Sequence, residues 1–406
     1  MFAGGYAKAS PDFGCGKVSA PGTSDAALVV KYGPTGTCAW SKLFGDAGAA
    51  ASHVTGLASD LAGDVYVAGD IAGSIDFGGG KLTSGGGTDG YLAKLDANGG
   101  YLWAQRFGDA AEQLATRVTV DQGGNAVVIG TYQGTLDLGG GKSVTSAGAE
   151  DVFVAKWSPQ GTVLWVKTFG GAGNQLGRDV VVDGSNAIFI TGVNNGTIDL
   201  GAGPLVSAGM GDAFIAKLDA NGVPQWSKEF GDGGDQTGTG VAVDAAGNLI
   251  VTGSFETKLD LGGGYVFTSL ALHDVWLAKF DTGGKLLWGA AGQGADNQLS
   301  DDVGVDLSGN ITIFGGFFGD INFGAPTTKM TTAGLADIFI ARFSSAGTPL
   351  WASRFGDASS QVMKAGAVDL AGHSVGVGVC FGTVNFGAGP IVGHGGEDFC
   401  VAKFGP

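Results

Sequence analysis

Short apolar runs, each about five to seven residues long, recur along the whole chain and are separated by turn signals. In residues 179–232 four such runs follow one another, at 179–183, 187–192, 212–219 and 223–231. Strands joined by tight turns produce this pattern, and no segment shows the longer period of a helix. We name the four strands A, B, C and D in chain order.

The four-strand pattern repeats with a nearly fixed period, which the tryptophan of strand D marks most clearly. Six tryptophans lie 63, 62, 61, 62 and 63 residues apart: Trp40, Trp103, Trp165, Trp226, Trp288 and Trp351. A repeat of this kind indicates units that leave an apolar face open and cover it with the next unit. We therefore expect these indoles to be buried between units.

Strands A and B form a predicted hairpin. Its turn carries Asp, Gly and Asn in most copies, as at 121–125, 244–248 and 306–310. An Asp side chain can cap such a turn by accepting backbone hydrogen bonds, and Gly supplies the positive φ. Strand A is apolar nearly throughout, as in 240–244, so we expect it to be buried on both faces.

Stacked four-stranded units predict an all-β fold, a β-propeller of four-stranded blades. A parallel β-helix is the main alternative, but its rungs are shorter than ~60 residues and need no tight hairpins. We expect a single propeller domain over 1–406. It comprises a partial blade at 1–46, repeats at 47–109, 110–171, 172–232, 233–291 and 292–357, and a partial blade at 358–406.

The number of blades follows from counting strands. Strands A and D each occur six times, whereas strand C occurs seven times. If the two partial blades join, six inner strands give six blades, closed by pairing of strand 37–43 with strand 398–404. Seven blades is the alternative, and it requires an inner strand that the pattern does not show.

Composition narrows the class of function. The chain has 79 Gly, 44% apolar residues and a formal net charge of −16. This charge disfavours binding to nucleic acid or to anionic membrane surfaces, because both require clustered cations. No apolar run approaches the ~20 residues that span a bilayer, so no membrane insertion is expected.

Two strings, DVFVAKWSPQGTVLWVKTFGG at 151–171 and GRDVVVDGSNAIFITG at 177–192, resemble the bacterial SBBP-type β-propeller repeat. The resemblance extends over essentially the whole chain. It implies a propeller in a secreted or surface-displayed protein, and it implies no catalytic residues. Residues 1–16 lack the pattern of a signal peptide and begin in mid-repeat, so we expect the chain to be one domain of a longer protein.

The four cysteines lie in the two partial blades: Cys15, Cys38, Cys380 and Cys400. An even number in this placement predicts disulfides in an oxidising compartment, although buried free cysteines are the alternative. Of the three possible connectivities we favour a bond between Cys380 and Cys400, because they end strand B and begin strand C of one blade.

The loop between strand D and the next strand A gives the best candidate site. Glutamine recurs there in five copies, and charged residues follow it. If strand A lines the axis, these side chains surround one mouth of the channel. The predicted ligand-binding residues are His53, Gln113, Gln175, Arg178, Gln236, Gln298, Asp301 and Gln361, with Arg117, Asp302 and Lys364 beside them. The alternative is that the glutamines satisfy loop backbone.

Other polar positions favour structural roles. The Asp-Leu-Gly element recurs at Asp12, Asp76, Asp137, Asp199 and Asp260, with Asn322 and Asn385 in two copies. One carboxylate per loop is too few for calcium, so we predict bonds to the glycine amides, no metal site and no cofactor. If calcium does bind, segment 231–236 is a better candidate than the Asp-Leu-Gly elements. Trp157 and Trp276 fall outside the period, and packing is favoured over an exposed sugar platform.

These observations favour a non-catalytic binding or scaffold module for protein or glycan. The alternative is a carbohydrate-active or other hydrolytic enzyme at the channel mouth. Its candidate residues are Asp301, Asp302, Arg178 and His53, but they lie on different blades and share no motif.

Overall fold

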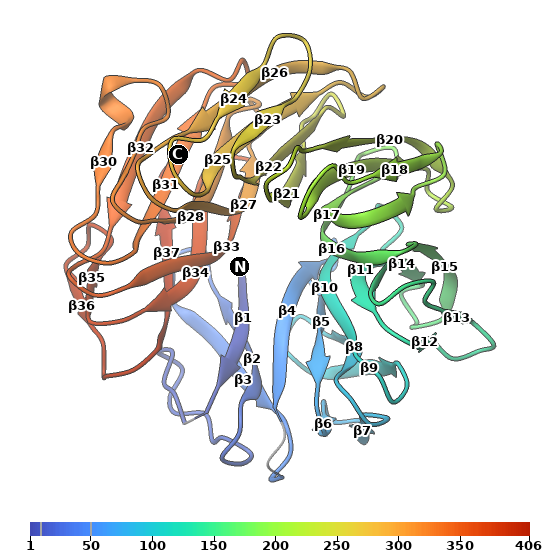
Figure 1. Cartoon of the computed structure of the whole chain (residues 1–406). Helices are drawn as coiled ribbons and strands as arrows, with labels where there is room; N and C mark the ends of the chain where they lie inside the picture. Colours follow the sequence, from blue (N-terminus) through green and yellow to red (C-terminus); the bar gives the residue numbers. More distant parts are fainter. Residues whose placement is uncertain (9, 49–50) are drawn as a thin grey trace. The chain divides into compact units, whose positions relative to one another are not determined.

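A computed structural model describes residues 1–8, 10–48 and 51–406 (Figure 1). The fold is all-β, and the helix found in the described residues is the short 3₁₀ turn η1 (Pro326–Thr328). Within those same ranges no helix is long and apolar enough to cross a membrane.

In the described residues, seven antiparallel sheets of three or more strands follow one another along the chain, and five of them contain the path A-B-C-D. Such a series makes the fold a β-propeller with seven blades. The blades are, in order, β1 (Phe2–Ala7), β2 (Ala26–Tyr32), β3 (Cys38–Phe44); β4 (Ser52–Ser59), β5 (Val65–Ile71), β8 (Asp89–Leu95), β9 (Tyr101–Phe107); β10 (Gln113–Val120), β11 (Ala126–Tyr132), β14 (Asp151–Trp157), β15 (Val163–Phe169); β16 (Gly173–Val182), β17 (Ile188–Asp199), β19 (Asp212–Leu218), β20 (Pro224–Phe230); β21 (Gln236–Val243), β22 (Leu249–Phe255), β25 (Asp274–Phe280), β26 (Leu286–Gly292); β27 (Gln298–Val305), β28 (Ile311–Phe317), β31 (Asp337–Phe343), β32 (Pro349–Phe355); and β33 (Gln361–Val368), β34 (Ser374–Cys380), β37 (Asp398–Phe404).

Between strands B and C the chain leaves the blade in a glycine-rich excursion with short strands of its own. In the fourth blade the excursion strand pairs with β17 itself. The excursion strands are β6 (Ser74–Asp76), β7 (Lys81–Thr83), β12 (Thr135–Asp137), β13 (Ser143–Thr145), β18 (Pro204–Val206), β23 (Lys258–Asp260), β24 (Val266–Thr268), β29 (Asp320–Ile321), β30 (Met330–Thr331), β35 (Thr383–Asn385) and β36 (Pro390–Val392).

The prediction of six blades was wrong, because β1 was missed as a strand. β1 pairs with β2 as strand B of a separate first blade. The first blade thus contains strands B, C and D, and the last contains A, B and C. The predicted pairing of strand 37–43 with 398–404 is also absent: β3 pairs with β2, and β37 pairs with β34. The six A strands and seven C strands were counted correctly.

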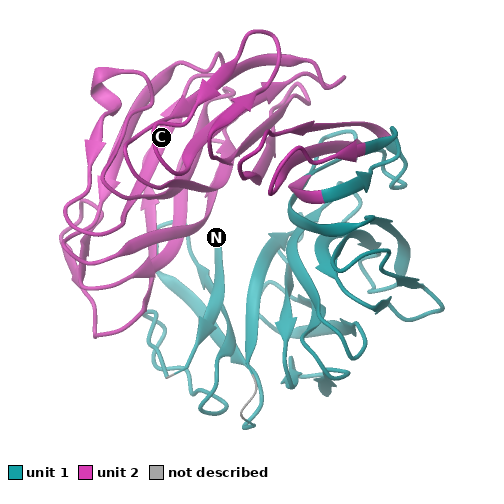
Figure 2. Cartoon of the chain, viewed as in Figure 1, with its two compact units in different colours: residues 1–190, 196–204, 218–224 teal, residues 191–195, 205–217, 225–406 magenta. Residues whose placement is uncertain are grey.

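The chain divides into two compact units (Figure 2). The first comprises residues 1–190, 196–204 and 218–224, and the second comprises 191–195, 205–217 and 225–406. In the first unit, consecutive blades share apolar clusters, one of which joins β5 to β2 and another β11 to β8. In the second unit, similar clusters join β28 to β25 and β34 to β31.

Strands B and C form the core of the blades. Every residue of β11, β14, β25 and β31 is buried. The expectation that strand A is buried on both faces was wrong, since β10 and β4 are only partly buried. Strand A lies at the edge of its sheet, whereas B and C are central strands that neighbouring blades cover on both faces.

The turn between strands A and B has the predicted chemistry. In the third blade Asp121 Oδ1 accepts hydrogen bonds from the amides of Gly123 and Asn125, both at 2.8 Å, and Gly124 has a φ of 76°. The Lys156 ammonium from strand C lies 2.7 Å from the other oxygen of Asp121. The same buried pair recurs as Lys94 with Asp60, Lys279 with Asp244 and Arg342 with Asp306.

The six periodic tryptophans pack between consecutive blades, as predicted, but they are less buried than expected: Trp288 is 9% exposed and the other five are half-buried. The Trp103 indole N–H donates to the carbonyl of Pro159 in the next blade, at 2.9 Å. Its ring covers Gly161, whose φ is 84° and where a Cβ would lie 2.9 Å from the indole. Equivalent hydrogen bonds join Trp40 to Ala97, Trp226 to Thr282 and Trp288 to Ser345.

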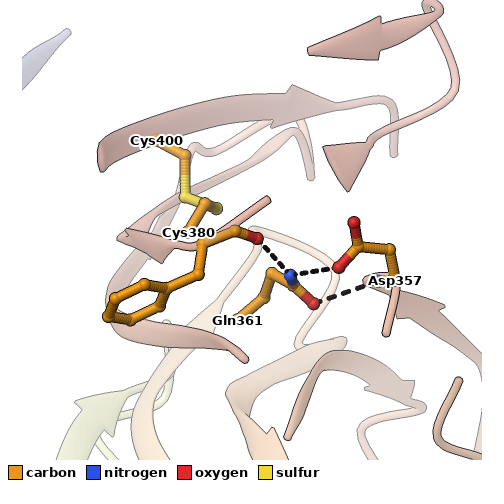
Figure 3. The surroundings of a disulfide bond; sticks show 5 residues. Asp357, Gln361, Cys380 and Cys400 are labelled. Atoms are coloured by element: carbon orange, nitrogen blue, oxygen red, sulfur yellow. Dashed lines mark hydrogen bonds between the residues drawn. A yellow bond between two sulfur atoms is a disulfide. The ribbon is translucent and has the colours of Figure 1, made fainter. Parts of the chain in front are cut away.

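Both end blades contain a disulfide. Cys380 and Cys400 are bonded (Figure 3), which confirms the favoured pair. Cys15 is bonded to Cys38. The first bond joins β34 to β37, and the second ties the excursion of the first blade to β3. Each end blade has three strands, so a crosslink replaces part of what a fourth strand would contribute.

The contact between Trp103 and Gly161 predicts a specific loss of stability. Gly161→Ala should lose about 1–2 kcal/mol because of the positive φ, and roughly a further 1–3 kcal/mol from overpacking against the indole. Gly124→Ala is the matched control, because its φ is 76° and the nearest atom, from Pro159, would lie 3.5 Å from the new Cβ. Urea unfolding of both variants measures the difference, and equal losses would contradict the packing.

The disulfides predict that the denatured, unreduced protein shows no free thiol and that reduction releases all four. Each bond closes a loop of 23 or 20 residues, so replacing both of its cysteines by Ala should lower the unfolding free energy by about 3 kcal/mol. Thiol titration and denaturant unfolding measure these effects. Four thiols before reduction would refute the assignment.

Candidate functional site

The five recurring glutamines are internal to the fold. Each has an exposed fraction of 0%; four of them begin strand A of their blade, and Gln175 is the third residue of β16. In the third blade the Gln113 side chain accepts from the amide of Asp109 (3.0 Å). It donates to the Asp109 carboxylate and to the carbonyl of Gln133, both at 2.9 Å. In the last blade Gln361 binds Asp357 and Phe381 in the same way (Figure 3).

These contacts agree with the alternative interpretation, in which the glutamines satisfy loop backbone. A ligand at a channel mouth would not reach side chains that are fully covered, so the glutamines do not belong to the candidate binding surface. His53 lies one residue after the glutamine position of the second blade. Ser52 occupies the glutamine position in the second blade, where its hydroxyl lies between the carbonyls of Phe44 and Asp25.

Half-buried or exposed polar side chains lie three residues after each glutamine position, and they are not the same in all blades. At this point the ladder between strands A and B shifts register, as at Thr55, Thr116, Thr239, Asp301 and Lys364. A bulge leaves one residue out of the pairing and turns its side chain in a new direction, which is common beside binding sites. Arg178 stands at the same distance from Gln175. We call these six positions the bulge residues.

In the first unit the bulge residues of three consecutive blades line one pocket of about 150 Å³. Thr55, Thr116 and the exposed Arg178 contribute to it. Strand B and the loop before strand C add polar groups, and two leucines that directly follow the recurring glutamine add apolar surface. These further residues are Asp70, Thr131, Glu150, Leu114 and Leu176, with backbone from Ala115 and Gly177.

Hydrogen bonds between blades fix the shape of this pocket. The Thr55 hydroxyl donates to the carbonyl of Ala115 (2.5 Å), and the amide of Gly177 donates to the hydroxyl of Thr131 (3.2 Å). Arg117 donates to the carbonyl of Thr55 (2.8 Å), and its Nε lies 3.8 Å from the carboxylate of Asp179. Arg117, predicted as part of the polar rim, therefore joins neighbouring blades. These contacts between blades therefore fix the pocket walls in the absence of a ligand.

His53 lies behind the pocket wall. Its Nδ1 is 2.9 Å from Asp70, and its Nε2 is 3.5 Å from Asp25. The hydrogen bond with Asp70 raises the pKa of His53, and the second carboxylate acts in the same direction, against the effect of burial. Because both ring nitrogens face carboxylates, the imidazole is held in an ion-pair cluster and presents neither nitrogen to the pocket as a base.

The predicted residues of the second unit have separate environments. Asp302 is buried, and its carboxylate accepts from the amides of Val303 (2.8 Å) and Gly366 (3.0 Å) in the next blade. It therefore links two blades. Asp301 is half-buried and Lys364 is exposed, both at bulge positions.

A set of buried carboxylates escaped sequence analysis. An Asp begins strand C in each complete blade and accepts from loop amides, as when Ala147 donates to Asp151. Arginine pairs with it in two blades, as Arg106 with Asp89 and Arg354 with Asp337. Burial raises the pKa of the carboxyl where no arginine is present, in Asp151, Asp212 and Asp274. The sequence feature that could have revealed them is the recurrence of Asp at the first residue of strand C.

The Asp of the Asp-Leu-Gly element binds glycine amides, as predicted. Asp76 Oδ1 accepts from Gly78 (2.7 Å) and Gly80 (3.1 Å), and Asn385 makes the equivalent contacts. In segment 231–236, Asp232 accepts from Gly234, Gln236 and Thr257. In the described part of the chain no group of three or more His, Cys, Asp or Glu side chains is arranged to hold a metal ion.

Trp157 and Trp276, predicted as packing residues, are fully buried. The Trp157 indole donates to the side-chain oxygen of Gln105 (3.0 Å) in the preceding blade. The indole of Trp276 donates to the carbonyl of Thr237 (3.0 Å). Neither ring is a platform for a sugar.

No protein-family profile matches the chain. It is 23% identical, over 65% of its length, to an uncharacterised WD repeat-containing protein of Acanthamoeba polyphaga mimivirus. It is 30% identical, over 41% of its length, to the regulatory protein FlaEY of Caulobacter vibrioides. The chain spans 24% and 18% of these relatives. A gluconolactonase structure from Xanthomonas campestris aligns with a TM-score of 0.39 and 14% identity, covering 87% of each chain.

The cluster around His53 predicts a pH-dependent contribution to stability. A raised pKa means that folding favours the protonated ring, so the contribution is complete below the ordinary value of 6.5 and is lost as the pH rises through the folded pKa. His53→Leu copies the residue at this position in the third and fourth blades. The wild-type protein should melt at a higher temperature than this variant, and the difference between the two melting temperatures should be larger at about pH 5.5 than at about pH 9. A difference that does not change with pH would contradict the assignment.

Proposed function

We propose that the chain is a non-catalytic binding module that recognises an uncharged, hydroxyl-bearing ligand, the end of a glycan, at the pocket lined by Thr55, Thr116 and Arg178. The observation that carries this proposal is that three consecutive blades contribute the residue at one repeat position, Thr55, Thr116 and Arg178, to one pocket, and that the first two of these positions are bulges. The residues that recur in every blade serve the fold, whereas the residues at the bulge differ between blades.

The lining favours a ligand that both donates and accepts hydrogen bonds. Asp70 and Glu150 offer acceptors and Arg178 offers donors. The hydroxyls of Thr116 and Thr131 can do either, whereas that of Thr55 donates to Ala115 and can only accept. Arg178 would repel a cationic group, and the carboxylates of Asp70 and Glu150 would repel an anionic group. Sugar hydroxyls meet both requirements, and the leucines can lie against the apolar face of a ring. The volume of about 150 Å³ suits one small group and is below the range of sites for drug-sized ligands.

The geometry gives less support to the hydrolytic alternative. Hydrolysis requires an acid, a base and an electrophile that converge on one bond. His53 is held between two carboxylates, and Asp302 is occupied by backbone amides. Asp70 and Glu150 remain as carboxyl groups at the pocket, and a hydrolysis assay tests them directly.

The two disulfides support an extracytoplasmic setting, because such bonds persist in oxidising compartments. We propose that the module is secreted or displayed at a cell surface, and that its repeats are of the SBBP type. A protein ligand at the same pocket is the alternative occupant.

The experiment is a glycan array probed with the labelled protein, followed by calorimetry with the strongest hit. Arg178→Met and Glu150→Gln should each weaken binding by roughly 1–3 kcal/mol, because each removes charge-assisted hydrogen bonds. Thr239→Ala is the control, since it changes the equivalent bulge residue of the fifth blade, which does not line this pocket. Thermal unfolding verifies that the variants fold.

Binding that survives both substitutions, or that is lost equally in the control, would place the site elsewhere. An array without hits would overturn the glycan assignment. Release of reducing sugar that disappears in Asp70→Asn would replace the binding role with hydrolysis.

A further inference from the structure

A row of exposed apolar side chains crosses three consecutive blades of the second unit. Met210, Leu272 and Leu335 are 65%, 49% and 58% exposed, and Leu270 beside them is 68% exposed. The first three stand at one repeat position, two residues before the Asp that begins strand C. The same position holds Gly87 and Ala149 in the second and third blades and Gly396 in the last. The apolar row is therefore a local feature and not part of the repeat.

Backbone hydrogen bonds hold the row in place. The amide of Met210 donates to the carbonyl of Gly234 (3.3 Å), and the amide of Leu270 donates to the Asp274 carboxylate (3.1 Å). Immediately after the apolar residue, the carbonyls of Gly211 and His273 accept from the glutamine that begins the next strand A. The loops are thus tied to the ordered junction between blades, and the apolar side chains are presented to solvent from fixed backbone.

Acidic groups flank this row. The carboxylates of Asp235 and Glu256 lie 3.8 Å and 3.5 Å from the His273 imidazole, which follows Leu272 directly. Asp235 also forms a bridge with Gly211, which follows Met210. Asp296 is exposed on the next junction. Exposed apolar side chains that are surrounded by polar groups mark protein interaction surfaces.

We propose that the row Met210, Leu272 and Leu335 is a docking surface for a basic, amphipathic segment of a partner protein. Apolar side chains of the segment would cover the row, while its Lys or Arg side chains would approach Asp235, Glu256 and Asp296. The acidic border selects against an acidic partner and accelerates encounter with a basic one. This surface lies apart from the pocket at Arg178 in sequence and in chemistry, so it adds an interaction to the proposed function and does not depend on it.

The test uses a fluorescein-labelled helical peptide made of leucine and lysine, and its glutamate counterpart with the same apolar face. Fluorescence anisotropy should show binding of the lysine peptide and not of the glutamate peptide. Replacing Met210, Leu272 and Leu335 together by Ser should weaken binding by roughly tenfold or more, because three apolar contacts are lost.

The matched control replaces three other exposed leucines by Ser: Leu61, Leu307 and Leu370, on turns between strands A and B. This variant should bind as wild type does, which separates the row from general attraction by a chain of charge −16. Equal losses in both variants, or no binding by wild type, would overturn the proposal. So would sedimentation velocity that shows self-association abolished by the row substitutions, because a second copy would then be the occupant.

Discussion

The buried glutamine at the start of strand A is the contact on which the blade junctions depend. Its amide binds the backbone of the loop that arrives from the preceding strand D, and it also binds the carbonyl that ends strand B, as Gln113 does with Asp109 and Gln133. Loop amides and carbonyls at this depth need partners inside the protein. The glutamine side chain supplies these partners. It thereby fixes the conformation of the loop that connects one blade to the next.

A second kind of contact, on the outer strand D, also joins consecutive blades. A tryptophan on strand D donates to the turn of the next blade and packs on a glycine with positive φ, as Trp103 does with Gly161. Because a side chain on this glycine would meet the indole, the tryptophan and the glycine recur together. The two contacts recur with the same period. Because each joins consecutive blades, neither can form in an isolated repeat.

Periodic residues could be predicted from the sequence because they report contacts that every blade repeats. The A–B turn, the tryptophan packing and the glycine-turn Asp were predicted on this basis. The Cys380–Cys400 bond was predicted from its place on adjacent strands of one blade. The number of blades could not be obtained in this way, since β1 lacks the hairpin turn by which strand B was identified elsewhere. The pocket was predicted only in part. Arg178 is close in sequence to a recurrent residue, whereas Asp70 and Glu150 come from other strands and reach the pocket through the packing of blades.

The contacts divide the polar residues into recurrent ones that maintain the fold and ones at the bulge that we propose bind the ligand. This division is tested most directly by Gln113→Leu, with the exposed Gln122→Leu as control. Urea unfolding and binding of the array-selected glycan should be measured on both. Gln113→Leu should lose roughly 2–4 kcal/mol of stability, because loop amide and carbonyl groups lose their partner, and should retain its affinity while folded. A variant of unchanged stability that no longer binds would contradict the account.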